Sequence, residues 1–138
     1  MHASAYEAVA GAFAPGQVVQ EFWWDDDADD GLRQAVEKQT GTELVDENHS
    51  DVCDGAIIWW RKSDAEEGDL TDMLVDAQAN LDDGGTIWVL TPKPTSPEHV
   101  GPADISEAAQ IAGMNATSAV SAGAEWSGTQ VVSRSRGK

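Results

Sequence analysis

The segment that decides the fold lies between residues 55 and 90 and reads GAIIWWRKSDAEEGDLTDMLVDAQANLDDGGTIWVL. Its two ends, Gly55 to Trp60 and Thr86 to Leu90, are almost wholly apolar, as is typical of strands covered on both faces of a parallel sheet. Between them apolar residues recur at helical spacing over residues 70–81, and Gly84-Gly85 predicts the end of that helix. The segment therefore predicts a strand, a crossover helix and a second, parallel strand.

The residues on either side of this unit predict further alternating elements. On the amino-terminal side we expect a helix from Ser4 that stops at Pro15-Gly16, a strand from Val18 to Trp24, a helix capped by Asp29 or Asp30 and ended by Thr40-Gly41, and a short strand from Glu43 to Asp46. On the carboxyl-terminal side we expect a loop enforced by Pro92, Pro94 and Pro97, a short helix at Asp104 to Gly113, and a hairpin of residues 117–122 and Thr129 to Ser133.

This order of elements predicts an α/β protein. The expected architecture is a three-layer sandwich around a mostly parallel, Rossmann-like sheet of about six strands, closed by the antiparallel hairpin. The length of 138 residues fits a single domain over residues 1–138, with flexible ends at residues 1–5 and 134–138.

The charge is strongly negative and unevenly distributed. The chain has 25 acidic and 8 basic side chains, a net charge of −17, and residues 1–83 carry the whole excess. Such a charge repels nucleic-acid backbones and anionic membrane surfaces, so neither is an expected partner. The single Cys53 excludes an intramolecular disulfide, and we find no charged signal start and no apolar run of about 20 residues. We therefore expect a cytoplasmic location.

The carboxyl ends of the predicted strands form the candidate site. In open α/β sheets, ligands bind beyond these ends. The rim residues expected there are Trp24, Asp25, Asp46, Trp60, Arg61, Thr91 and Lys93. The tryptophans form adjacent pairs at Trp23-Trp24 and Trp59-Trp60, and neighbouring strand residues face opposite sides of a sheet. One indole of each pair can therefore pack beneath a helix while the other lines the rim, and the favoured alternative is that all four pack in the core.

Residues 43–133 resemble the class I methyltransferases that use S-adenosylmethionine. The strand from Asp51 to Trp60, the turn from Leu81 to Gly85 and the closing hairpin carry the resemblance, which implies that Asp46 occupies the position of the residue that binds the cofactor ribose. The first predicted turn departs from that family. It reads WWDDDADDG over residues 23–31, with one glycine, where the cofactor needs a glycine-rich cradle. The resemblance thus predicts the fold and no bound cofactor.

The whole chain is similar to an actinobacterial family, the domain of unknown function 3052. The matching segments are residues 16–21 leading to Trp24-Asp25, Trp59-Trp60-Arg61, Ile87 to Lys93, Ile105 to Gly113 and Trp126 to Val131. The resemblance implies an actinobacterial cytoplasmic protein and no particular activity.

The chain shows no pattern of catalytic or metal-binding residues. His2, His49, His99 and Cys53 lack the spacing of metal ligands, and the acidic stretch from Asp25 to Gly31 fits neither register of a calcium loop. We interpret that stretch as a solvated loop that caps the following helix.

Three functional hypotheses remain. The first is a non-catalytic interaction or regulatory module on a methyltransferase-like scaffold, steered by its charge toward a basic protein. The second is a binding protein or enzyme for an anionic metabolite or nucleotide, which Arg61 and Lys93 would hold, with the exposed tryptophans stacking on it and Asp46 accepting a hydroxyl. The third and weakest is an acidic mimic of nucleic acid.

Overall fold

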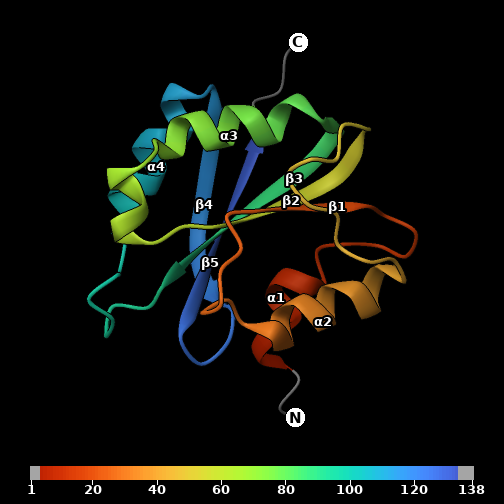
Figure 1. The fold of residues 1–138 in the computed structure, drawn as a ribbon, viewed down its shortest axis with the longest axis horizontal. Coiled ribbons are helices and arrows are strands. Elements are labelled where there is room, and N and C mark those ends of the chain that lie inside the picture. Colours follow the sequence, from red (N-terminus) through yellow and green to blue (C-terminus); the bar gives the residue numbers. More distant parts are fainter. Residues whose placement is uncertain (1–3, 134–138) are drawn as a thin grey trace.

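A five-stranded sheet lies at the centre of the computed structural model, which describes residues 4–133 (Figure 1). Its order is β1-β2-β3-β5-β4. The strands are β1 (Val19–Phe22), β2 (Cys53–Trp59), β3 (Leu81–Pro92), β4 (Met114–Ser121) and β5 (Trp126–Ser133). The first three are parallel, whereas β5 lies antiparallel between β3 and β4. The predicted parallel sheet and closing hairpin are both confirmed.

Helices cover both faces of the sheet and complete three layers (Figure 1). One face carries α1 (Ser4–Ala10) and α2 (Asp30–Thr40), and the other carries α3 (Leu70–Ala79) and α4 (Pro102–Ile111). A short 3-10 helix, η1 (Lys62–Glu66), follows β2. None of the helices within residues 4–133 combines the length and the apolarity needed to cross a lipid bilayer.

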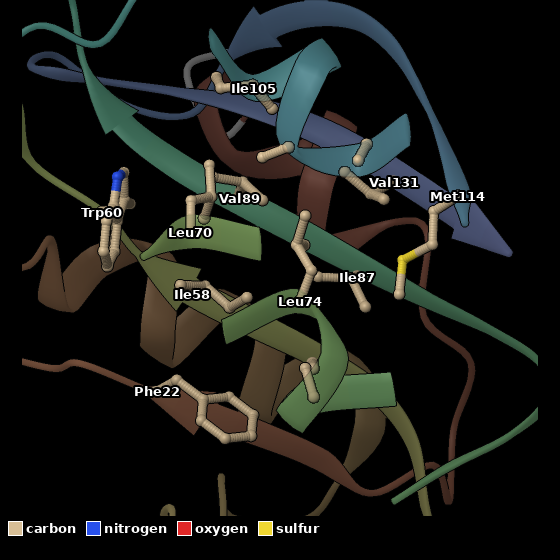
Figure 2. Packing of buried hydrophobic residues seen from close by; sticks show 14 of the residues in the cluster. Phe22, Ile58, Trp60, Leu70, Leu74, Ile87, Val89, Ile105, Met114 and Val131 are labelled. Atoms are coloured by element: carbon tan, nitrogen blue, oxygen red, sulfur yellow. The ribbon is translucent and has the colours of Figure 1, made fainter. Parts of the chain in front are cut away.

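Strand β2 and Trp60, which follows it, contribute side chains to two separate hydrophobic cores. Ile58 and Trp60 pack beneath α3 and α4, as Figure 2 shows, whereas Ile57 and Trp59 pack beneath α1 and α2. All four side chains are buried, which is why this stretch contains no polar residue. The prediction that adjacent tryptophans face opposite sides of the sheet is thereby confirmed for Trp59 and Trp60.

The predicted end of the helix over residues 70–81 was wrong. Helix α3 ends at Ala79, and Leu81 already belongs to β3, with Gly84-Gly85 inside the strand. The cause is pairing with β2, because the Cys53 amide donates to the Asn80 carbonyl at 2.7 Å and Cys53 lies opposite Leu81. A side chain at Gly85 would meet the Asp54 carbonyl oxygen, so this glycine permits a close approach of two strands.

The strand predicted at Glu43 to Asp46 is reduced to a single bridge. Val45 accepts from the Glu21 amide at 2.8 Å and donates to the Val19 carbonyl at 3.0 Å, and pairing stops there. The Gln20 side chain donates to the carbonyls of Asp46 and His49, which turns the chain away from the sheet. Within residues 4–133 the sheet therefore has five strands where about six were expected.

Helix α2 confirms its predicted boundaries. The Asp29 carboxylate accepts a hydrogen bond from the Leu32 amide at 3.2 Å, and Gly41 ends the helix with a φ of 77°. Of the ends expected to be flexible, residues 1–3 and 134–138 lie outside the described residues, whereas Ser4 and the following residue belong to α1.

Substitution of Gly55 should destabilise the fold, because a methyl group at this position would overlap the Phe13 ring, which packs closely against β2. We expect Gly55→Ala to lower the free energy of unfolding in urea by about 1–3 kcal/mol. The matched control is Gly101→Ser, at the start of α4, where a new side chain would meet open space. Equal stability of the two variants would contradict the close packing of Phe13 on β2.

Candidate functional site

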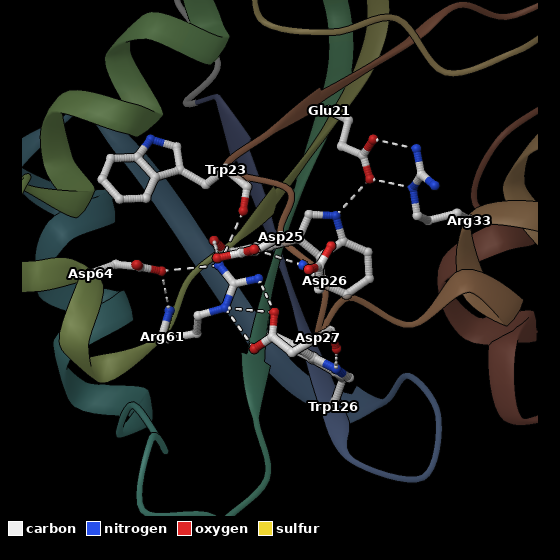
Figure 3. A network of polar contacts seen from close by, with 10 residues as sticks. Glu21, Trp23, Asp25, Asp26, Asp27, Arg33, Arg61, Asp64 and Trp126 are labelled. Atoms are coloured by element: carbon white, nitrogen blue, oxygen red, sulfur yellow. Dashed lines mark hydrogen bonds and ion pairs between the residues drawn. The ribbon is translucent and has the colours of Figure 1, made fainter.

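Arg61 joins the carboxyl ends of β1 and β2. It lies two residues after the end of β2 and is only 6% exposed. Its guanidinium donates to the Asp27 carboxylate, with Nε 2.9 Å from Oδ2, and to Asp64 Oδ2 at 3.1 Å (Figure 3). Nη1 also donates to the carbonyl oxygens of Trp23 at 3.0 Å and Trp59 at 3.2 Å. We call this arrangement the Arg61 clasp; it fastens the β1–α2 loop to the end of β2.

The clasp extends to β5 through Trp126. The Trp126 indole lies beneath the guanidinium, with the Arg61 carbon 5.4 Å from the ring centroid, and its Nε1 donates to the Asp27 carbonyl oxygen at 3.2 Å. Both groups of Asp27 are therefore engaged, the carboxylate by Arg61 and the carbonyl by Trp126. Segments as distant in sequence as residues 27, 61 and 126 meet at this one point.

A second ion pair holds the other side of the loop. Arg33 of α2 reaches the buried Glu21 of β1 with two hydrogen bonds, at 2.7 and 2.9 Å. The Trp59 indole also donates to Glu21, at 2.8 Å (Figure 3). Because the partners lie on β1 and α2, the loop between them is tied at both of its ends.

Trp23 has a strained backbone at the start of the loop. Its φ of 58° lies in the left-handed region, where a bulky residue is rare. Its neighbours fix this conformation: the amide donates to Glu47 Oε2 at 2.8 Å, the carbonyl accepts from Arg61, and the indole packs edge-on against Trp60 at 5.1 Å. Strain of about 1–3 kcal/mol persists only where contacts of this kind oppose it.

The ion pairs shift the pKa values of Asp27, Arg33 and Arg61. Hydrogen bonds from Arg61 hold the pKa of Asp27 below its ordinary value, against the opposing effect of partial burial. The hydrogen bond to Glu21 raises the pKa of Arg33. Burial alone would lower the pKa of Arg61, but its hydrogen bonds to Asp27 and Asp64 outweigh that and raise it. All of these charges are therefore maintained at neutral pH.

The structure divides the predicted rim residues into an inner and an outer group. The inner residues Trp60, Arg61 and Thr91 are buried. The outer residues Asp25 and Asp46 are exposed, as is Trp24, which has 48% of its surface accessible and lies 5.6 Å beneath the Arg33 guanidinium carbon. Of the predicted rim, Arg61 has the most polar contacts, and they come from the protein itself.

Asp46 and Lys93 lie apart from the clasp. The Asp46 carboxylate accepts from the Asn48 amide at 2.9 Å in its own turn. Lys93 leaves the end of β3 and its ammonium donates to the Ser121 hydroxyl at 3.0 Å, beside the hairpin. Neither residue is joined to Arg61 in one binding surface.

Exposed carboxylates lie on two segments next to Trp23 and Trp24. The loop contributes Asp25 and Asp26, the start of α2 contributes Asp30, which lies 3.5 Å from Arg33, and the turn after the Val45 bridge contributes Asp46 and Glu47. The two segments meet where Glu47 accepts from the Trp23 amide. We call these five acids together with Trp24 the acidic corner.

A groove opens on the face of the sheet that α3 and α4 cover, beside Trp60. Its volume is 580 Å³, and its lining includes Trp60, Leu70, Val100, Ala108 and Ile111. Of the predicted rim only Trp60 contributes to it. The sequence predicted neither this groove nor the role of Asp27, because Arg61 and Asp27 are 34 positions apart and no local pattern links them.

Comparison with solved structures identifies the fold. The chain is similar to magnesium protoporphyrin IX methyltransferase from Synechocystis PCC 6803, solved with bound SAM, with a TM-score of 0.58 and 10% identity, covering 96% of this chain and 80% of that one. A methyltransferase from Pyrococcus furiosus gives a TM-score of 0.57 and 13% identity over 95% of this chain and 82% of that one. The fold is that of the class I methyltransferases, as the sequence predicted.

The chain belongs to the family described as "Protein of unknown function (DUF3052)", whose model matches residues 8–135. It is 46% identical over 131 residues to uncharacterized proteins of Mycobacterium tuberculosis and Mycobacterium bovis, covering 95% of this chain and 80% of each relative. The predicted family is therefore confirmed.

Loss of the Asp27 charge should weaken the fold in a pH-dependent way. We expect Asp27→Asn to lower the free energy of unfolding by about 1 kcal/mol at pH 7, a modest value because the Asp27 side chain is 55% exposed. The folded-state pKa is depressed, so the stability from this pair is present above the ordinary pKa and is lost as pH falls through the folded-state pKa. The wild type and variant should therefore converge in acid.

Urea unfolding followed by tryptophan fluorescence between pH 7 and pH 2.5 provides the measurement. The matched control is Asp26→Asn, which removes the adjacent exposed charge outside the clasp. A stability difference for Asp27→Asn that stays constant over this range would contradict the ion pair.

Proposed function

We propose that this protein is a non-catalytic interaction module on a methyltransferase-like scaffold, and that its acidic corner binds a basic partner protein. The Arg61 clasp carries the proposal. In open α/β sheets, ligands bind beyond the carboxyl ends of the strands. At the ends of β1 and β2 this space holds protein side chains that are hydrogen-bonded to one another.

The residues of the first turn do not fit S-adenosylmethionine. A cofactor cradle needs backbone amides that a ligand can approach closely, hence glycine. Here the turn offers the indoles of Trp23 and Trp24 and the clasped Asp27, and the Trp23 amide is already bonded to Glu47. The carboxylates would also repel the carboxylate of the cofactor. These features favour a role other than methyl transfer.

The acidic corner suits a basic protein surface. Its five carboxylates are exposed, and Trp24, with 48% of its surface accessible, adds an exposed aromatic group whose ring already has the Arg33 guanidinium over it. Such a patch raises the rate of encounter with a positively charged partner more than it raises the affinity. A mimic of nucleic acid would be a special case of the same proposal, because its partner would also be basic.

A binding site for an anionic metabolite is the second candidate. The groove beside α3 and α4 has the volume of a small-molecule site. Against it, the Arg61 donors bind Asp27, Asp64 and two carbonyl groups, so an anion could reach this guanidinium only by breaking the clasp. The observations therefore favour the interaction module.

The cofactor analogue S-adenosylhomocysteine should not bind. We expect no change in melting temperature and no heat of binding at millimolar ligand, because ligand binding would stabilise the folded state in proportion to its affinity. A class I methyltransferase measured in parallel serves as the positive control. Saturable binding tighter than about 1 mM, or methyl transfer by the purified protein, would overturn the non-catalytic assignment.

Neutralising the acidic corner should slow partner association. A partner captured from native extract would be purified, and its binding kinetics measured at 50 and 300 mM salt. We expect Asp25→Asn with Asp26→Asn to lower the association rate about tenfold at low salt and to change dissociation little. The control pair Glu7→Gln with Asp51→Asn removes the same charge from exposed positions elsewhere. Association that is insensitive to salt and equal in both pairs would contradict the proposal.

A further inference from the structure

The groove between α3 and α4 combines an apolar floor with an acidic rim. Its floor consists of the buried apolar side chains that line it, which are Trp60 after β2, Leu70 at the start of α3, Val100 and Ala108. The first three are large apolar side chains that also belong to the core beneath the two helices (Figure 2 labels Trp60 and Leu70). The floor is thus a rigid surface continuous with the core.

Ile111 extends this apolar surface into solvent. It lines the groove at the end of α4 and is 68% exposed, although isoleucine is among the residue types most often buried. A single exposed apolar residue is ordinary. One that continues the apolar floor of a groove instead marks a surface suited to binding another apolar group.

The charges around the groove are mainly negative. Asp69, Asp104 and Glu107 line it, all exposed, against the single ammonium of Lys62. Lys62 in turn lies near the Glu98 carboxylate and helps lower its pKa, after the hydrogen bonds from Ser63. The remaining titratable side chain, His99, has its Nδ1 2.8 Å from the Pro92 carbonyl oxygen. The rim therefore favours cationic groups beside an apolar one.

We propose that this groove binds a short segment of the partner protein that inserts one or two aliphatic side chains between α3 and α4 and places lysine or arginine residues against the acidic rim. The inference rests on the proposed function, since it assigns a second contact surface to the same basic partner. An amphipathic peptide in an apolar groove is a common mode of recognition, in which the apolar anchors supply affinity and the flanking charges supply orientation. An anionic metabolite would meet three carboxylates here, so the charge opposes it.

A titration of the isotope-labelled protein with defined peptides tests this inference. The probe is the acetylated peptide KLLKKLLK, and the comparison peptides are KSSKKSSK, which keeps the charge, and ELLEELLE, which keeps the leucines. We expect KLLKKLLK to shift the amide resonances of Thr71, Ala108 and Ile111, at least tenfold more tightly than either comparison peptide. Equal binding of KSSKKSSK, or shifts confined to the acidic corner, would overturn it.

Two substitutions separate the groove from general surface effects. Ile111→Ser should weaken KLLKKLLK binding about tenfold. Val52→Ser, which removes an equally exposed aliphatic side chain outside the groove lining, should leave it unchanged. Equal affinities of the two variants would overturn the groove assignment. Because neither substitution touches the acidic corner, such a failure would leave salt-dependent partner binding standing, whereas binding of S-adenosylhomocysteine would count against the proposed function itself.

Discussion

The Arg61 guanidinium holds together the segments at the carboxyl ends of β1 and β2. A charge that is almost fully removed from water is strongly destabilising unless its donors are paired. Here two carboxylates and two carbonyl groups accept from it, and they come from the β1–α2 loop, the end of β2 and η1. The position of each of these segments is therefore set by one side chain. The strained backbone of Trp23 is part of the same constraint, because its carbonyl must face inward to reach Arg61.

The two ion pairs also determine which charge reaches the surface. Residues 1–83 contain four basic side chains, and two of them, Arg33 and Arg61, are bound to carboxylates around the β1–α2 loop. Arg33 lies against Glu21 and Asp30, and Arg61 lies against Asp27 and Asp64, so two cations serve four of the acids. Asp25 and Asp26 directly precede Asp27 in sequence and are exposed, and of the three Asp27 is the one that pairs with Arg61. The two ion pairs and the acidic corner are thus two consequences of one uneven distribution of charge.

Local sequence signals predicted the elements whose causes are local. The apolar run at β2, the Asp29 cap and Gly41 of α2, and the closing hairpin all depend on residues within a few positions of one another, and they were confirmed. The end of α3 was wrong because Leu81 fits a helical pattern equally well until β2 pairs with it. The site was predicted less well for the same reason. Arg61 and Asp27 are separated by 34 positions, so their pairing follows from the topology and from no local pattern.

The methyltransferase-like fold and the altered β1–α2 turn are compatible because they depend on different residues. The fold rests on the buried faces of β2 and β3 and on the helices above and below them, whereas the altered turn lies at the carboxyl ends of the strands. The β1–α2 turn can therefore change without loss of the sheet, provided that the new turn is held. Glycine would leave this turn free to approach a ligand, whereas Trp23 and Asp27 need Arg61 to be stable there. The turn and Arg61 form one physical unit, so replacement of the turn by glycines alone would leave the buried guanidinium without its Asp27 carboxylate and would destabilise the protein before it created a cofactor cradle.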